Sequence, residues 1–227
     1  MKISIIIPVL DDEVALSSTL SHLQGFRQHG HEVIVVDGGS SDNTLVFAYE
    51  AADKVIISRP GRALQMNSGA AVADGQLLLF LHADTRLPDD AETALLSLAD
   101  EGESAVDFWG RFDIRLSGNR VIFRLIEWLV NLRSRLTSIA TGDQAIFVTT
   151  RLFERVGAFP EIALMEDVEL SRRLAKISSP LCLRQKVITS SRRWEAKGVV
   201  STVLLMWKLR LLYSLGVSPD KLNQMYR

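Results

Sequence analysis

Short apolar runs alternate with stretches of helix-like spacing throughout the first hundred residues, and this pattern constrains the fold most. The runs cover residues 3–7, 32–36, 54–57 and 77–81. Segments typical of helices cover residues 13–29, 43–52, 63–73 and 89–100. Continuous Val, Ile and Leu runs suit strands that are covered on both faces, and strand–helix alternation favours parallel strands with right-handed crossovers. We therefore expect an α/β protein with a largely parallel sheet.

The regular alternation fades after residue 105. The sequence predicts further strands over residues 106–116 and 144–149, and helices over residues 119–136, 165–177 and 199–215. No internal repeat or low-complexity linker divides the chain. With 227 residues, 47% of them hydrophobic, the chain is long enough for one large domain with a substantial core. We expect a single domain whose first half is of the nucleotide-binding type.

Charge is distributed unevenly along the chain although the formal net charge is only −1. Residues 1–115 contain 8 Lys or Arg against 18 Asp or Glu, whereas residues 116–227 contain 18 against 9. The overall balance predicts no nucleic-acid partner. The basic second half either faces an anionic substrate or membrane, or is simply a polarised solvated surface.

Cysteine content and hydropathy indicate where the chain resides. The single cysteine, Cys182, excludes an internal disulfide and predicts a buried thiol in a reducing compartment. The N-terminal apolar run is too short for a signal peptide. No stretch approaches the roughly 20 uncharged apolar residues of a membrane span. We expect a cytoplasmic protein, with attachment to the cytoplasmic face of a membrane as the alternative.

Polar residues follow the predicted strands, where ligands bind in open α/β sheets. Asp37 begins the stretch DGGSSDNT, and Arg62 and Asn67 belong to GRALQMNSGAA. Asp37 either accepts a hydrogen bond from a nucleoside or shapes its own turn. Arg62 either holds a diphosphate or lies on the surface.

The fourth and most apolar run ends on HADT, which contains His82 and Asp84. Asp37 and Asp84 would share one edge of the sheet and repel each other unless a positive charge lay beside them. Mg²⁺ or Mn²⁺ bound to a diphosphate would supply that charge. His82 would point the same way as Asp84 and ligate the metal, or bond the ribose or phosphate, or be a satisfied histidine at the rim.

Two further motifs carry polar groups suited to an acceptor site. Glu166 and Asp167 begin a predicted helix, where the macrodipole alone favours acidic residues. A general base that accepts the proton of an attacking hydroxyl is the functional alternative. Gly142, Asp143 and Gln144 precede a predicted strand and are candidates to line an acceptor pocket.

Taken together, the motifs resemble those of family 2 glycosyltransferases, which have the GT-A fold. The similarity extends in order through SIIIPVLDDE, VIVVDGGSSDNT, GRALQMNSGAA, LLLFLHADTRLP, TGDQAIFV, FPEIALMEDVELSRRL and SRRW. A small bacterial subfamily, the rSAM/selenodomain-associated glycosyltransferases, is especially similar. The resemblance implies a Rossmann-like, mixed and mainly parallel sheet flanked by helices. It also implies inverting transfer from a nucleoside diphosphate sugar to an acceptor hydroxyl, with Mn²⁺ or Mg²⁺. Residues 1–115 would bind the nucleotide sugar and residues 116–227 the acceptor.

Carried over by position, the resemblance assigns roles to individual residues. Asp167 would be the catalytic base, with Glu166 beside it. Asp84 would bind the metal, joined by His82, which replaces the first aspartate of the usual DxD motif. The donor-binding residues would be Pro8, Val9, Glu13, Asp37, Arg62, Asn67, His82 and Asp84. The acceptor-binding residues would be Gly142, Asp143, Gln144, Arg193 and Trp194.

Several alternatives remain open from the sequence. Residues 119–136 carry an apolar face made by Ile122, Leu125, Leu129, Leu132 and Leu136 and a second apolar strip at Phe123, Ile126 and Val130. In residues 199–215, Lys208 and Arg210 interrupt an apolar run that contains Trp207 and Tyr213. Core packing or a homodimer interface would explain both helices, and so would peripheral contact with an anionic membrane. Lipid-phosphate glycosyl transfer and non-catalytic sugar-nucleotide binding are the rival functions. A nucleotidyltransferase is disfavoured because PVLDDEV is acidic and lacks glycine.

Overall fold

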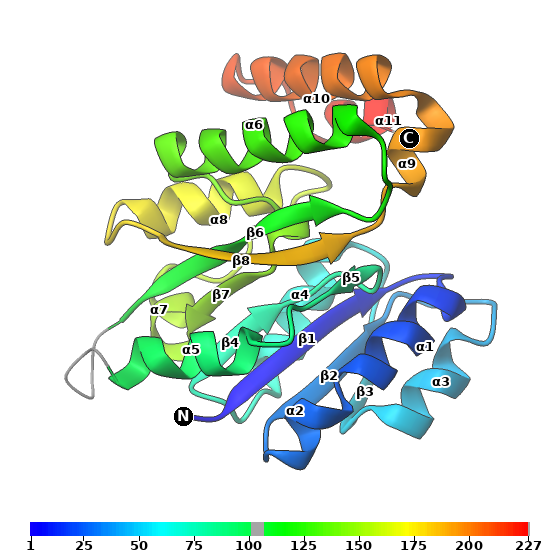
Figure 1. The fold of residues 1–227 in the computed structure, drawn as a ribbon, viewed down its shortest axis with the longest axis vertical. Coiled ribbons are helices and arrows are strands. Elements are labelled where there is room, and N and C mark those ends of the chain that lie inside the picture. Colours follow the sequence, from blue (N-terminus) through cyan, green and yellow to red (C-terminus); the bar gives the residue numbers. More distant parts are fainter. Residues whose placement is uncertain (101–106, 227) are drawn as a thin grey trace.

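A computed structural model describes residues 1–100 and 107–226 of the chain (Figure 1). Within these residues, one eight-stranded sheet has the order β3-β2-β1-β4-β7-β6-β8-β5. The strands are β1 (Ile3–Val9), β2 (Glu32–Asp37), β3 (Lys54–Ile57), β4 (Leu77–Phe80), β5 (Thr85–Arg86), β6 (Trp109–Leu116), β7 (Ile146–Thr149) and β8 (Leu181–Thr189).

Strand direction changes along the sheet. The first four strands in that order pair in parallel, β1 with β2 and β4, and β2 with β3. β7 is antiparallel to both β4 and β6, β8 is parallel to β6, and β5 is antiparallel to β8. The prediction of a mixed, mainly parallel sheet flanked by helices is therefore confirmed.

Helices lie on both sides of this sheet (Figure 1). They are α1 (Glu13–His22), α2 (Gln24–Gln28), α3 (Thr44–Ala51), α4 (Arg62–Ala71), α5 (Ala91–Asp100), α6 (Val121–Thr137), α7 (Thr150–Arg155), α8 (Glu166–Ala175), α9 (Arg192–Lys197), α10 (Val199–Ser214) and α11 (Pro219–Tyr226). The helix predicted over residues 13–29 is two helices that meet at Leu23. The sequence analysis missed β5, β8, α7, α9 and α11, and residue 106 of one predicted strand lies outside the described residues.

Alternate residues of the central strands enter two separate cores, so both faces of the sheet are buried. Ile5 and Leu79 face the core that contains Leu16 and Leu20 of α1. Ile6 faces the opposite core with Met66 of α4. A Cβ atom added to Gly69 of α4 would lie 2.5 Å from Ile6 Cγ2, so only glycine permits this close helix–sheet contact. Two-sided burial explains why these strands are continuously apolar.

The side of α6 that faces the sheet is partly polar. β6 pairs with β7 only at Trp109 and Gly110, which leaves the rest of that edge without a strand partner. Side chains of α6 satisfy it: the Leu116 N–H donates to Glu127 Oε1 at 2.7 Å, and the Ile114 N–H donates to Asn131 Oδ1 at 2.9 Å. Buried backbone donors need such partners, so the polar residues of this helix point inward.

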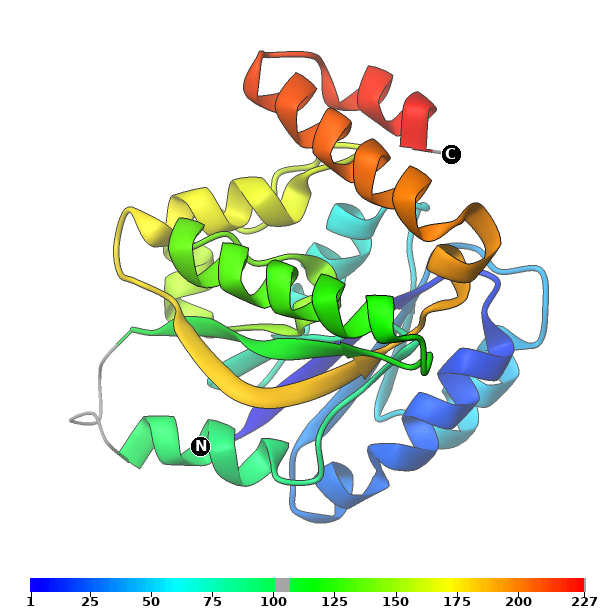
Figure 2. The ribbon, with the colours of Figure 1, turned by 45° about the horizontal axis from the view of Figure 1, so that its top comes forward.

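The C-terminal helices cover one end of the molecule (Figure 2). Leu209 of α10 and Leu222 of α11 pack against Met165 and Val168 at the start of α8. Cys182 is partly exposed, so the predicted burial of its thiol is wrong. Within the described ranges, no helix is both long and apolar enough to span a bilayer.

Candidate functional site

The carboxyl ends of β1 and β2 carry loops that fasten to each other. The buried carboxylate of Asp37 accepts hydrogen bonds from the Gly39 N–H at 2.7 Å and the Ser40 N–H at 2.8 Å. Glu13 Oε2 accepts from the Asn43 N–H at 2.9 Å, while the Glu13 N–H donates to Asp42 at 3.2 Å. In this structure Asp37 holds its own loop, as the turn interpretation requires, and Glu13 joins that loop to the start of α1.

Helix α4 secures the same strand ends from the other side. Gln65, which was not among the predicted site residues, donates through Nε2 to the carbonyls of Val9 and Val36, each at 2.8 Å. Pro8 and Val9 are buried at the end of β1. The Asn67 amide donates to the Phe159 carbonyl at 2.9 Å and accepts from the Phe159 N–H at 3.0 Å. Both amide atoms of Asn67 therefore hold the loop that precedes α8.

A positive charge lies beside one of the two predicted carboxylates, Asp84, and it comes from a residue far along the chain. Arg192 of α9 contacts Asp12 at 2.9 Å and Asp84 at 3.8 Å. Burial raises the pKa of Asp84, and Arg192 opposes that shift. The sequence analysis did not single out Arg192, because only tertiary structure brings α9 to this edge.

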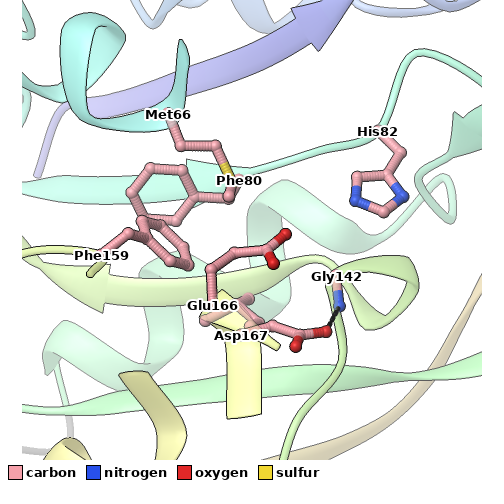
Figure 3. A pocket seen from close by; sticks show the side chains of 8 residues that line it. Met66, Phe80, His82, Gly142, Phe159, Glu166 and Asp167 are labelled. Atoms are coloured by element: carbon pink, nitrogen blue, oxygen red, sulfur yellow. Dashed lines mark hydrogen bonds between the residues drawn. The ribbon is translucent and has the colours of Figure 1, made fainter. Parts of the chain in front are cut away.

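A small cavity lies beyond the end of β4 (Figure 3). Residues of two predicted motifs line it: His82 of HADT, and Glu166 and Asp167 at the start of α8. It is lined by Met66, Phe80, His82, Gly142, Ile146, Phe159, Glu166 and Asp167. Phenylalanine and methionine side chains form one side of it, and the imidazole and the two carboxylates lie on the other side. Segments that are more than 50 residues apart in the sequence thus meet at one place.

His82 is neutral in this cavity. Burial, and then the positive charge of Arg62, lower the pKa of His82 to about 3. Its Nε2 atom is buried and has no hydrogen-bond partner among the described residues. Gly142 lies against it, since a Cβ at this position would be 2.5 Å from His82 Nε2. An unpartnered buried nitrogen is costly, and a bound ligand would satisfy it.

Glu166 and Asp167 begin α8 directly after a residue in an unusual conformation. Met165 has φ 73° and ψ 19°, in the left-handed region that non-glycine residues seldom adopt. Asp167 accepts from the Gly142 N–H at 3.0 Å and from the Val168 N–H at 2.7 Å. Figure 3 shows Asp167 directed at Gly142 and the Glu166 carboxylate extending toward the side of the cavity that holds His82. Burial, and then the negative charge of Asp167, raise the pKa of Glu166 to about 7.

Arg62 supplies a positive charge to these groups. Its side chain is accessible to solvent, although protein surrounds it closely enough that desolvation is the largest influence on its pKa. That influence lowers the pKa, but Glu166, Tyr226, Asp167 and Asp143 all raise it, so the net shift is upward. The predicted residues Arg62, His82, Asp143, Glu166 and Asp167 are therefore electrostatic neighbours.

The predicted acceptor residues divide into two groups. Gly142 lines the cavity, and the buried Gln144 accepts the Thr141 N–H at 3.1 Å in the 3₁₀ turn Gly142–Gln144. Arg193 stacks 3.6 Å from the centroid of the Tyr226 ring, and Trp194 packs beside the cluster containing Phe123 of α6. Arg193 and Trp194 therefore do not line the cavity.

A divalent cation fits this site only if a ligand shares it. Among the described residues, no group of three or more His, Cys, Asp or Glu side chains is placed to hold a metal. Asp84 offers a carboxylate, and Mg²⁺ commonly takes one or two carboxylates together with phosphate oxygens and water. His82 adds a neutral nitrogen without a partner. Asp84 does not line the cavity that His82 lines, so an ion held by both would need diphosphate oxygens as further ligands.

Comparison with known proteins agrees with the geometry. An uncharacterized glycosyltransferase of Mycobacterium tuberculosis (strain H37Rv) is 29% identical over 195 residues, which cover 80% of this chain and 72% of the relative.

Two solved structures have a similar fold. Staphylococcus aureus TarS 1–349 in complex with UDP has a TM-score of 0.65 at 20% identity, over 84% of this chain and 60% of that one. The mannosyltransferase PcManGT from Pyrobaculum calidifontis, in complex with GDP-Man and Mn²⁺, has a TM-score of 0.61 at 17% identity, over 99% of this chain and 68% of that one. The chain thus spans less than two thirds of the TarS structure. Both similarities support the predicted GT-A fold.

The sequence model of glycosyl transferase family 2 matches residues 4–158, a range that begins in β1 and contains most of the site, including His82, Asp84 and Gly142. Since this range is more than half of the chain, the protein belongs to glycosyl transferase family 2 and is a glycosyltransferase.

Proposed function

We propose that the protein transfers a sugar from a nucleoside diphosphate sugar to an acceptor hydroxyl, with inversion and in a single displacement. The observation that carries this proposal is the meeting of Asp167, Glu166 and His82 at one cavity beyond β4, with Arg62 as their electrostatic neighbour. The complexes of TarS with UDP and of PcManGT with GDP-Man support a nucleotide-sugar donor. In this proposal residues 1–115 bind the donor and residues 116–227 bind the acceptor, within a single domain.

The leaving group would be a nucleoside diphosphate, whose negative charge increases as its bond to the anomeric carbon breaks. Arg62 and Arg192 are the cations placed to stabilise that charge. Asp84 and His82 would hold Mn²⁺ or Mg²⁺, which as a Lewis acid would neutralise diphosphate oxygens. The Mn²⁺ in the PcManGT complex supports this assignment. Pro8, Val9, Glu13, Asp37 and Asn67 remain proposed donor-site residues. Glu13, Asp37 and Asn67 would act through the loops they fix.

Asp167 would accept the proton of the acceptor hydroxyl. The Gly142 and Val168 N–H groups donate hydrogen bonds to its carboxylate and fix its orientation. The hydroxyl oxygen attacks the anomeric carbon opposite the diphosphate, which leaves with the bonding electron pair. The configuration inverts because one displacement occurs, and no covalent enzyme intermediate is needed.

Replacing Asp167 with asparagine tests the proposal. We expect Asp167→Asn to lower kcat by about 10²–10⁴-fold, the usual contribution of a positioned base. Donor affinity, measured by calorimetry, should stay within a few-fold of the wild-type value because Asp167 contacts the acceptor. Glu169→Gln is the matched control, since Glu169 lies in the same first helical turn but pairs with Arg172 and Arg173. Wild-type turnover by Asp167→Asn would refute the assignment.

Lipid-phosphate transfer is a second candidate, favoured by the exposed apolar residues of α6 and α10. Glycan acceptors and polyprenyl phosphates assayed in parallel would separate the two. A non-catalytic donor-binding protein would show neither transfer nor donor hydrolysis with Mn²⁺.

A further inference from the structure

Helix α6 presents an apolar face to solvent. The exposed residues of this face are Val121, Ile122, Leu125, Trp128, Leu129 and Leu136. Their spacing of three or four residues places them on one side of the helix. The opposite side carries Glu127, Asn131 and Ser134, which are buried and bond to β6. A surface helix normally has the reverse arrangement, with its apolar side inward.

Helix α10 carries a second exposed apolar stripe. Its exposed members are Val200, Leu204, Trp207, Leu211 and, directly after the helix, Leu215. Val199 packs beside Phe123 and Ile126 of α6, so the two helices adjoin. Figures 1 and 2 both show α10 next to α6, on the side away from β1. We call the eleven exposed residues of the two stripes the apolar face. Its two tryptophans are 59% exposed at Trp128 and 66% exposed at Trp207.

The charged residues that α6 and α10 themselves expose have one sign. Within residues 121–137 and 199–214, Glu127 is the only acidic residue, and it is 5% exposed and paired with Arg124. Arg120 is exposed just before α6, and Lys208 is exposed between Leu204 and Leu211 of α10. Arg210 adds a further cation. An incoming surface that covers the apolar face therefore meets positive charge and no exposed carboxylate of either helix.

We propose that the apolar face docks on the surface of an anionic lipid bilayer. Tryptophan side chains and apolar residues flanked by Lys and Arg are typical of helices that lie in the membrane interface. Anionic headgroups complement the basic residues. A second copy of this chain fits less well, since a two-fold interface would bring the same basic residues together. The proposal concerns binding alone and does not depend on the donor or acceptor.

Co-sedimentation of the full chain with vesicles tests the proposal directly. We expect binding to vesicles containing phosphatidylglycerol at low salt, and much weaker binding to pure phosphatidylcholine or at high salt. The double variant Trp128→Ser/Trp207→Ser should lower the partition coefficient by about tenfold or more. The reason is that two aromatic side chains that would be buried in the bilayer are lost. Lys208→Glu should weaken binding only when phosphatidylglycerol is present.

Tyr49→Ser provides the matched control. Tyr49 is an aromatic residue that is 64% exposed and belongs to α3. Helix α3 lies at the other end of the molecule from α6 and α10 (Figure 1), so binding should be unchanged. Thermal denaturation of each variant checks that the fold is retained. The proposal is overturned if the wild type does not bind phosphatidylglycerol at low salt, or if the tryptophan variant binds equally well. It is also overturned if sedimentation equilibrium shows a dimer that the tryptophan variant dissociates, with no vesicle binding.

Discussion

Glu166 and Asp167 are neighbours in sequence, but their surroundings give their carboxylates different properties. Asp167 accepts hydrogen bonds from two backbone N–H groups, which fix the orientation of its carboxylate. Glu166 is buried beside Asp167, and burial followed by the charge of Asp167 raises the pKa of Glu166 to about 7. The Glu166 carboxyl can therefore hold a proton near neutral pH. Environment rather than residue type divides the two roles.

Protonation of Glu166 makes a prediction about stability and pH. Its pKa is raised on folding above its ordinary value of 4.5, so the folded state binds this proton more tightly. The stabilisation is complete below the unfolded pKa and is lost as pH rises through about 7. Glu166→Gln should remove this loss. As pH rises from 4.5 to about 7, the Tm of this variant should therefore fall less than the Tm of the wild type. Thermal denaturation across the interval measures the effect, with Glu169→Gln as control, and identical profiles for wild type and Glu166→Gln would contradict it.

The contact between Gly142 and His82 makes a second residue-scale prediction. Gly142→Ala would place a Cβ 2.5 Å from His82 Nε2, so the imidazole or the 3₁₀ turn must shift. We expect this variant to lower kcat at least about tenfold, since small displacements at a catalytic site are costly. Gly25→Ala is the matched control, because its Cβ meets nothing within 4 Å in α2. Equal activity of the two variants would show that the contact is unimportant.

At the scale of elements, α6 and the edge of β6 depend on each other. The sequence analysis predicted a helix with two apolar strips and interpreted core packing as one option. The structure buries the strip containing Phe123 and Ile126 and exposes the strip containing Leu125 and Leu129. The reason is the edge of β6, whose backbone groups need the polar side chains between these strips.

Removing one of those side chains should destabilise the fold. Asn131 accepts from the Ile114 N–H at 2.9 Å and donates to the Ile114 carbonyl at 3.2 Å. Asn131→Leu keeps a similar volume but leaves both backbone groups unpaired, which should cost about 1–3 kcal/mol in the free energy of unfolding. Denaturant titration measures this cost. Asn119→Leu, at an exposed position before α6, should change stability by less than about 0.5 kcal/mol. Equal values for the two variants would refute the role of Asn131.

At the scale of the whole molecule, the site is assembled from both halves of the chain. The acidic first half supplies Asp12 and Asp84, and the basic second half supplies Arg192 through α9. The uneven charge of the sequence thus has a structural counterpart at the sheet edge. Arg192 is largely exposed, so its ion pairs contribute little to stability, and their importance would lie in donor binding.

The shared cation site makes a prediction at this scale. Asp84→Ala should abolish the additional rise in Tm that Mn²⁺ causes in the presence of a nucleoside diphosphate, because ligand-linked stabilisation needs the carboxylate. Thermal shift with Mn²⁺, the diphosphate and both together measures the linkage. Asp89→Ala, an exposed acidic position nearby in sequence, should retain the full shift. A full shift in Asp84→Ala would remove Asp84 from the metal site.

The sequence by itself determined the alternating strands and helices, the burial of the sheet on both faces and the placing of His82 and Asp84 beyond a strand end. These features follow from local patterns: apolar periodicity, and polar residues where strands stop. Only the tertiary structure decided that Arg192 meets Asp84, that Asn67 holds Phe159 and that α6 turns its polar side inward. Each of these depends on groups far apart in the chain whose burial and charge must be satisfied together, and no local pattern records such pairings.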